Sequence, residues 1–224
     1  MNGPWALLTL GFLLGMRHAT DSDHVVAVTT LVSRERRVVG AALLGAFWGL
    51  GHTATLLAVG LPVVLFGLVI PERLGLTLEF SVALMLMLLG GWNLTEFLRR
   101  MHEKTAHEHA PQPDTAAPLR RALRSLAVGV VHGLAGSAAV ALLVLTQVTN
   151  VAWAALYLAL FGVGTIAGMA LVTAALALPM SLVAARSRSF VAHFGWVSGA
   201  LSLGFGLFLV YRIGFVDGLF LAWR

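Results

Sequence analysis

Long apolar blocks separated by short polar segments dominate this chain of 224 residues. Each block can cross a bilayer, because a spanning helix needs about 20 mostly apolar residues. The predicted spans are residues 4–30, 39–61, 77–98, 123–146, 151–178 and 194–216. The pattern therefore predicts an all-α fold, a polytopic bundle of about six transmembrane helices.

One polar segment, residues 99–122, is long enough to be a linker between the third and fourth spans. Its histidines are His102, His107 and His109. They could collect metal ions, but a solvated, proline-containing segment pays a large ordering cost before it can chelate. The linker separates a first three-helix unit, residues 1–98, from a second, residues 123–224.

The two units show weak internal similarity at a spacing of 114 residues. The matches are Gly15 with Gly129, His18 with His132, Phe47 with Phe161 and Gly90 with Gly204. Because each unit has an odd number of spans, the second must cross the membrane in the opposite sense. The sequence thus predicts two inverted three-helix repeats, an arrangement in which secondary transporters place their substrate site near the midplane.

Basic residues predict the orientation. Of the 15 Lys and Arg residues, 11 fall in the loops after the first, third and fifth spans. They are Arg34, Arg36, Arg37, Arg99, Arg100, Lys104, Arg120, Arg121, Arg124, Arg186 and Arg188. Since basic loops stay in the cytoplasm, both termini are expected outside.

Composition supports a membrane protein. The chain is 58% hydrophobic and 11% charged, against about 25% charged residues in soluble domains. The net charge of +5 is accounted for by cytoplasmic loops, so we expect no nucleic-acid partner. The absence of cysteine excludes disulfides and thiolate metal ligands.

The first span carries the sequence RHATDSDH over residues 17–24. Such a density of ionisable residues inside a membrane is costly unless they face a polar interior. On a regular helix His18, Asp21 and His24 form one arc at about 0°, −60° and −120°. Asp23 lies off that arc at about +140°, so it either faces another span or the helix unwinds locally.

Two further histidines are candidates for the same site. Counting about 1.5 Å per helical residue places His18 and His52 at similar depth near the midplane. His132 occupies the position equivalent to His18 in the second unit, either as a ligand or as an interhelical hydrogen-bonding residue. Imidazoles with carboxylates suit nickel, cobalt, zinc or iron rather than magnesium or calcium. A cluster that merely holds helices together is the simpler alternative.

With these residues in view, the chain resembles the nickel/cobalt transporter (NiCoT) family and its shorter relatives of the urease-accessory nickel permease type. The family signature, an arginine followed by HAxDxDH, matches residues 17–24, and its aromatic-rich Gly-His-Ser/Thr pattern matches residues 47–53. The resemblance implies metal uptake, with roles for His18, Asp21, Asp23, His24 and His52. The chain departs from the family by offering six spans rather than eight, and by Val28-Thr29-Thr30 where an Asp-Asn pair is usual.

Three alternatives remain open at this stage. His18 and Asp23 also satisfy the HxxxxD spacing of glycerolipid acyltransferases, in which histidine is the base, but no sizeable soluble segment exists for an acyl-CoA site. A metal exporter would have the same topology. A purely structural subunit would not need this density of buried charge.

We therefore expect a multi-pass permease of a prokaryotic plasma membrane, not an enzyme, that takes up Ni²⁺, with Co²⁺ as the second candidate. The expected metal ligands are His18, Asp21, Asp23, His24, His52 and His132. The metal ion is the transported substrate and no cofactor is expected. The expected partners are the ion and the lipid bilayer, with a homo-oligomer left open.

The topology can be tested because the chain has no native cysteine. Single cysteines at positions 3, 36, 112, 149 and 188 should react with an impermeant thiol reagent in intact cells only at 3 and 149. The reason is the bias of basic residues toward the other loops. External labelling at position 112 would contradict six spans with both termini outside.

Overall fold

The computed structural model describes residues 4–33, 35, 37–68, 70–103, 117–134, 150–183 and 188–221, and this part of the chain is all-helical. The α-helices are α1 (Pro4–His18), α2 (Ser22–Val32), α3 (Val38–Phe66), α4 (Glu72–Glu103), α5 (Ala117–Gly133), α7 (Val151–Val183) and α8 (Arg188–Tyr211). A short π-helix, η2 (Arg212–Val216), follows α8. The predicted all-α class is confirmed.

Four of the described helices are long and apolar enough to cross a membrane. These segments are Val38–Val63, Glu72–Arg99, Val151–Leu182 and His193–Val216. They correspond to the predicted second, third, fifth and sixth spans. The predicted first span is two shorter helices, α1 of 15 residues and α2 of 11. Of the predicted fourth span, α5 ends at Gly133 and residues 135–146 lie outside the described part.

The predicted linker, residues 99–122, overlaps the ends of the two helices that it connects. α4 continues through Glu103, and α5 begins at Ala117, so both ends of the 99–122 segment are helical. Residues 104–116, with His107 and His109, lie outside the described residues.

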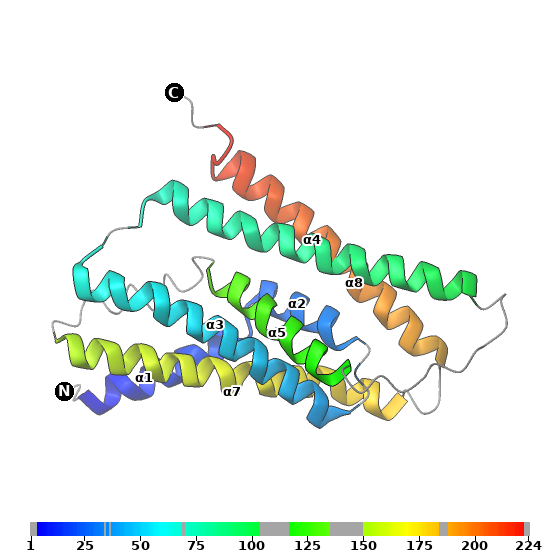
Figure 1. Ribbon diagram of the computed structural model, residues 1–224, viewed down its shortest axis with the longest axis horizontal. Coiled ribbons are helices and arrows are strands. Elements are labelled where there is room, and N and C mark those ends of the chain that lie inside the picture. The colour runs from blue at the N-terminus through cyan, green and yellow to red at the C-terminus, as the bar shows by residue number, and fades with distance from the viewer. Residues whose placement is uncertain are drawn as a thin grey trace.

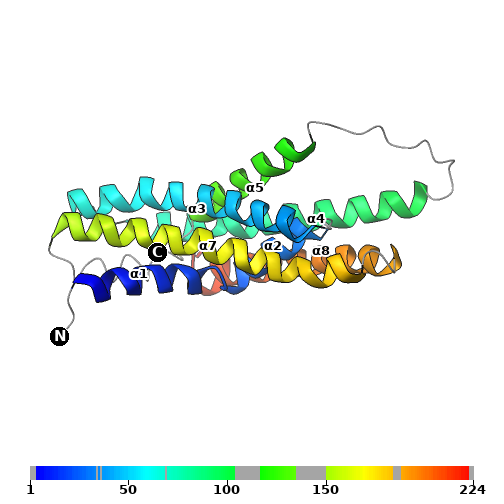
Figure 2. The ribbon, with the colours of Figure 1, turned by 90° about the horizontal axis from the view of Figure 1, so that it is seen from below.

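The long helices pack in antiparallel pairs. α3 lies against α7, and α4 lies against α8 (Figures 1 and 2). α1 packs on α7, whereas α5 packs on α3 and runs in the opposite direction to α1 (Figure 2). The short α2 contacts α8, α4 and α7. This arrangement brings the end of α1, the start of α2, the middle of α3 and the end of α5 together in the interior.

Glycines allow two of these helix pairs to approach closely. A Cβ added at Gly15 of α1 would overlap the backbone of Phe161 on α7, and one added at Gly129 of α5 would overlap the backbone of Trp48 on α3. Small residues at such positions let van der Waals contacts and interhelical hydrogen bonds form in a membrane, where the hydrophobic effect does not drive helix association.

Interhelical hydrogen bonds from small hydroxyl side chains add to this packing. Thr53 donates to the Gly162 carbonyl at 3.1 Å, Ser125 to the Leu44 carbonyl at 2.6 Å, and Ser202 to the Leu86 carbonyl at 2.9 Å. These three bonds connect α3 with α7, α5 with α3, and α8 with α4. Each polar side chain is thereby satisfied inside an apolar protein.

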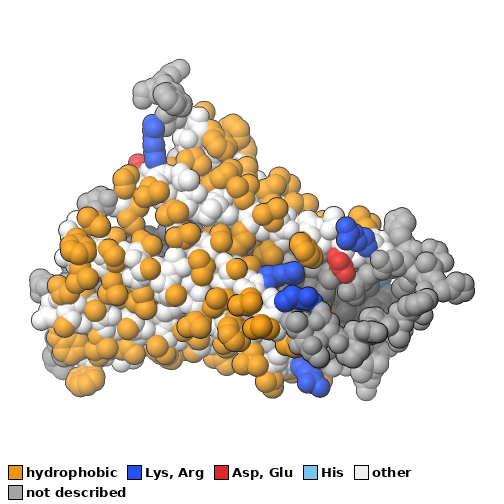
Figure 3. Space-filling view, viewed as in Figure 1, with side chains coloured by type: hydrophobic (Ala, Val, Ile, Leu, Met, Phe, Trp, Pro, Cys, Tyr) orange, Lys and Arg blue, Asp and Glu red, His pale blue; other side chains and the backbone are white. Residues whose placement is uncertain are grey.

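The outer surface is apolar. Leu88 and Leu182 are 75% and 67% exposed. Figure 3 shows hydrophobic side chains over much of one face, with most of its Lys and Arg side chains toward the right-hand side. An exposed apolar surface of this extent marks contact with another apolar phase. Together with the four long apolar helices, it identifies a membrane protein.

The glycine contact between α1 and α7 should be sensitive to size. Gly15→Val should lower the thermal stability of the detergent-solubilised protein, because overpacking costs about 1–3 kcal/mol. Gly91→Val on α4 is the matched control, since a Cβ there meets nothing within 4 Å. Equal melting temperatures for the two variants, measured by fluorescence-detected size-exclusion chromatography after heating, would contradict the close α1–α7 contact.

Candidate metal site

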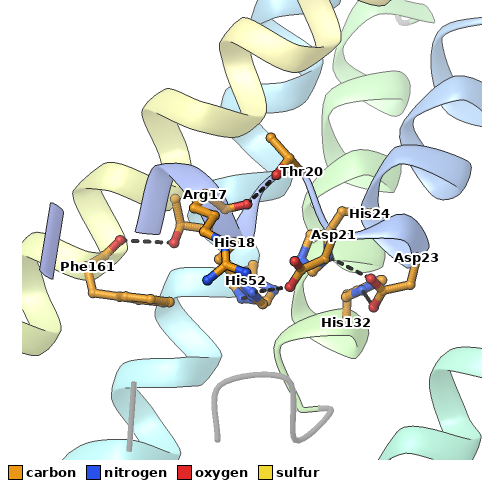
Figure 4. Close-up of polar contacts among 10 residues, drawn as sticks. Arg17, His18, Thr20, Asp21, Asp23, His24, His52, His132 and Phe161 are labelled. Carbon is orange, nitrogen blue, oxygen red and sulfur yellow. Dashed lines mark hydrogen bonds and ion pairs between the residues drawn. The ribbon is translucent and has the colours of Figure 1, made fainter. Parts of the chain in front are cut away.

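The first predicted span is broken at its cluster of ionisable residues. α1 ends at His18, and α2 begins at Ser22. Between them the backbone turns through short-range bonds, from the Thr20 N–H to the Arg17 carbonyl at 2.8 Å and from the Asp21 N–H to the His18 carbonyl at 3.1 Å. Figure 4 shows the two half-helices meeting at this turn. Both possibilities that the sequence left open for Asp23 are observed: the helix unwinds locally, and the Asp23 side chain faces another helix, α5.

Polar side chains stabilise the break. The Thr20 hydroxyl donates to the Arg17 carbonyl at 2.6 Å, which satisfies an acceptor that a continuous helix would have used. Asp21 is the N-cap residue of α2, with φ −61° and ψ 148°, yet its carboxylate does not cap the helix. It lies instead 2.8 Å from Nδ1 of His18. Non-helical backbone inside a membrane protein is tolerated where such partners are available.

His18, His24 and His52 converge on one point from three helices, α1, α2 and α3. One ring nitrogen of each lies within 4.8 Å of the others, and all three residues are buried. The Nε2 atoms of His18 and His52 are 3.2 Å apart. Two imidazole nitrogens that each lie about 2.1 Å from one ion would be about 3.0–3.4 Å apart. The spacing therefore suits either a hydrogen bond or joint coordination of a cation.

Asp23, His24 and His132 form a second group that adds α5. Their ligand atoms also lie within 4.8 Å of one another. One oxygen of Asp23 is 2.8 Å from Nε2 of His132, and the other is 3.2 Å from Nδ1 of His24. His24 belongs to both groups, so the four histidines and Asp23 make one continuous cluster (Figure 4).

Several ring nitrogens in this cluster lack a hydrogen-bond partner in the described part of the chain. They are Nε2 of His24 and Nδ1 of His52 and of His132, all fully buried. A buried polar atom without a partner is costly and calls for an explanation. Coordination of a cation is one use of such a nitrogen, because a neutral imidazole binds metal through its unprotonated nitrogen.

Two aromatic side chains enclose the cluster. The Trp48 ring stacks on His24, with centroids 5.5 Å apart and an interplanar angle of 27°, and Phe161 lies 5.6 Å from the His18 ring. Sequence reasoning did not assign Trp48 a role at the site. Its position four residues before His52, on the same face of α3, is the signal that could have done so.

The structure brings the predicted metal ligands together in the buried cluster, with the exception of Asp21. His18, Asp23, His24, His52 and His132 lie in the buried cluster. Asp21 contacts the cluster only through His18, and its side chain is 46% exposed.

The predicted arc, with Asp21 between two imidazoles, is wrong. The helix ends at His18, and Nδ1 of His24 faces Asp23 instead. His102 lies in the last turn of α4.

The acyltransferase alternative depends on a contact between His18 and Asp23, and these two side chains form other contacts instead. The Asp23 carboxylate pairs with His24 and His132, while His18 pairs with Asp21. An HxxxxD base would need the aspartate to orient the histidine that precedes it by five residues. This geometry therefore gives no support to an acyltransferase site.

Comparisons with known proteins give one relative that matches nearly end to end. The chain is 37% identical over 221 residues to the urease accessory protein UreH of Bacillus sp. (strain TB-90), covering 97% of this chain and 96% of that protein. It is 28% and 25% identical to the chloroplast proteins FOR GROWTH AND FERTILITY 1 and 2 of Arabidopsis thaliana. Each alignment covers 89% of this chain but only 57% and 55% of those proteins.

No family model matches the chain, and no solved structure matches it. The near full-length similarity to UreH is well above what a shared membrane composition would produce. The chain therefore belongs to the family of the urease accessory protein UreH.

Proposed function

We propose that this protein carries Ni²⁺ across the membrane through the histidine–aspartate cluster, with Co²⁺ as the alternative cargo. The observation that carries the proposal is the convergence of four buried histidines and one carboxylate from four helices at a broken transmembrane segment. Intramembrane ionisable residues of this kind mark ion pathways. The likeness to a urease accessory protein supports nickel, because urease is a nickel enzyme.

The ligand chemistry agrees with this cargo. Neutral imidazole nitrogens and a carboxylate favour divalent nickel, cobalt or zinc over the hard cations magnesium and calcium. Asp23 supplies a negative charge that offsets part of the charge of a dication in a low-dielectric interior. The aromatic wall of Trp48 and Phe161 limits the space around the ion.

We infer further that the two units are inverted repeats. Gly15 of α1 contacts Phe161 of α7, and Gly129 of α5, 114 residues after Gly15, contacts Trp48 of α3, the residue next to Phe47, which matches Phe161 at the same spacing. The corresponding helices run in opposite directions (Figure 2). His18 and His132 each lie at the end of the first helix of their unit. Equivalent contacts on oppositely oriented helices are what an inverted repeat requires.

Uptake is the direction that we favour over export. The bias of basic residues toward three loops supports an orientation with both termini outside. The membrane potential, negative inside, favours inward movement of a dication by about 2.3 kcal/mol per elementary charge for each 100 mV. An exporter would need a further energy source to oppose that force.

The ligand roles can be tested on purified protein. His18→Ala, His24→Ala and Asp23→Asn should each abolish Ni²⁺ uptake into proteoliposomes, because each removes a donor or the charge that offsets the dication. Nickel binding per folded molecule, measured by isothermal titration calorimetry, separates lost binding from lost folding. His193→Ala is the matched control, a histidine exposed on α8. Normal stoichiometry and affinity in all three cluster variants would end the proposal.

Asp21 should have a weaker effect than Asp23. Its carboxylate faces Nδ1 of His18, so it orients the ring and leaves Nε2 directed at His52. Removing such an orienting partner costs about 10–100-fold in metal affinity. Asp21→Asn should therefore weaken nickel binding by about tenfold while retaining saturable uptake. Complete loss of binding in Asp21→Asn alone would show that Asp21 itself contacts the ion.

A further inference from the structure

A cavity of about 290 Å³ lies between α2, α4, α8 and η2. Its polar lining consists of Ser22, Asp23, Glu79, Arg212 and Asp217, and the remaining walls are apolar. Three carboxylates therefore face one guanidinium in this space. The cavity extends from the start of α2, in the interior of the protein, to the residues that follow α8.

Glu79 is an unexplained charge in a membrane-spanning helix. It lies seven residues after the start of α4, inside the candidate span Glu72–Arg99, or about 10 Å along the helix. Among the described residues its carboxylate forms no hydrogen bond or ion pair. Ionisable side chains within a span are rare, and they typically face a water-filled cavity or an ion path. The polar cavity supplies such an environment for Glu79.

The inner end of the cavity is part of the histidine cluster. Asp23 lines the cavity and at the same time contacts His132 and His24. The imidazole nitrogens that face the Asp23 carboxylate are Nε2 of His132 and Nδ1 of His24. A cation that reached Asp23 from the cavity would thus meet two imidazole nitrogens beside the carboxylate.

The other end of the cavity is formed by an irregular segment. The π-helix η2 carries Arg212, whose Nε lies 3.8 Å from an oxygen of Asp217. Both side chains are partly exposed, at 59% and 34%. π-helical turns within α-helices frequently occur at functional sites. This end lies near the start of α4 and the end of α8, which is the outer side in the orientation given by the basic loops.

We propose that this cavity is the outer access path for the transported cation. Along this path Glu79 attracts the ion as it moves from the Arg212–Asp217 pair toward Asp23. The proposal rests on the proposed function for its cargo. Glu79 is a positioning residue that raises the local concentration of a dication and does not hold the ion in the bound state. A carboxylate in a low-dielectric cleft raises capture rates in this way.

The first test measures the concentration dependence of Ni²⁺ uptake into proteoliposomes. Glu79→Gln should raise the half-maximal concentration about three- to tenfold and leave the maximal rate and equilibrium nickel binding in detergent nearly unchanged. Glu79→Asp, which restores the charge, should recover most of the loss. Glu72→Gln, on the exposed first turn of the same helix, is the matched control and should behave as wild type. Unchanged half-maximal concentration in Glu79→Gln, or an equal shift in both Gln variants, would overturn the proposal.

The second test measures access to the cavity independently of transport. Ser22 lines the cavity and is exposed, whereas Leu84 is exposed on the apolar surface of α4. In this cysteine-free chain, Ser22→Cys should react with a cationic, membrane-impermeant thiol reagent from outside, and Leu84→Cys should not. Nickel should slow the reaction of Ser22→Cys. A Ser22→Cys variant that does not react, or reacts only from the cytoplasmic side, overturns the access path. A wild type that neither binds nor carries nickel instead overturns the proposed function.

Discussion

The Asp23 carboxylate, held between two buried imidazoles, is the interaction on which the interior of this protein depends. A charge inside a membrane protein needs partners, and His132 on α5 and His24 on α2 supply them at 2.8 and 3.2 Å. Asp23 can face α5 only because the first span breaks at His18 and restarts at Ser22. The break, the position of α5 and the composition of the cluster therefore depend on one another.

Close helix packing makes this convergence possible. Gly15 and Gly129 let α1 and α5 lie directly against α7 and α3. Side chains from α1, α2, α3 and α5 can then meet within a few ångströms. Larger residues at these two glycines would separate the helices and move His18 and His132 away from their partners. Packing of small residues thus determines the geometry of a polar site.

The cluster and the polar cavity share Asp23. In the proposed mechanism the same carboxylate receives the cation from the cavity and contributes charge where the imidazoles provide donor nitrogens. Glu79 and the Arg212–Asp217 pair lie farther out along the same cavity. A graded series of carboxylates leading to neutral imidazoles allows an ion to lose water gradually while its charge stays compensated.

The amino-acid sequence by itself determined the all-α class, the four long apolar helices and the density of ionisable residues in residues 17–24. These features depend on local composition and spacing, which a linear pattern contains. Only the tertiary structure decided that the first span is broken and that Asp23 rather than Asp21 faces His24. It also decided that Trp48 borders the histidine cluster and that Glu79 lines the cavity. The physical reason is that a regular-helix projection assigns faces as if every residue rotated by about 100°. A three-residue interruption, residues 19–21, made favourable by contacts with α3 and α5, changes the direction of every side chain that follows.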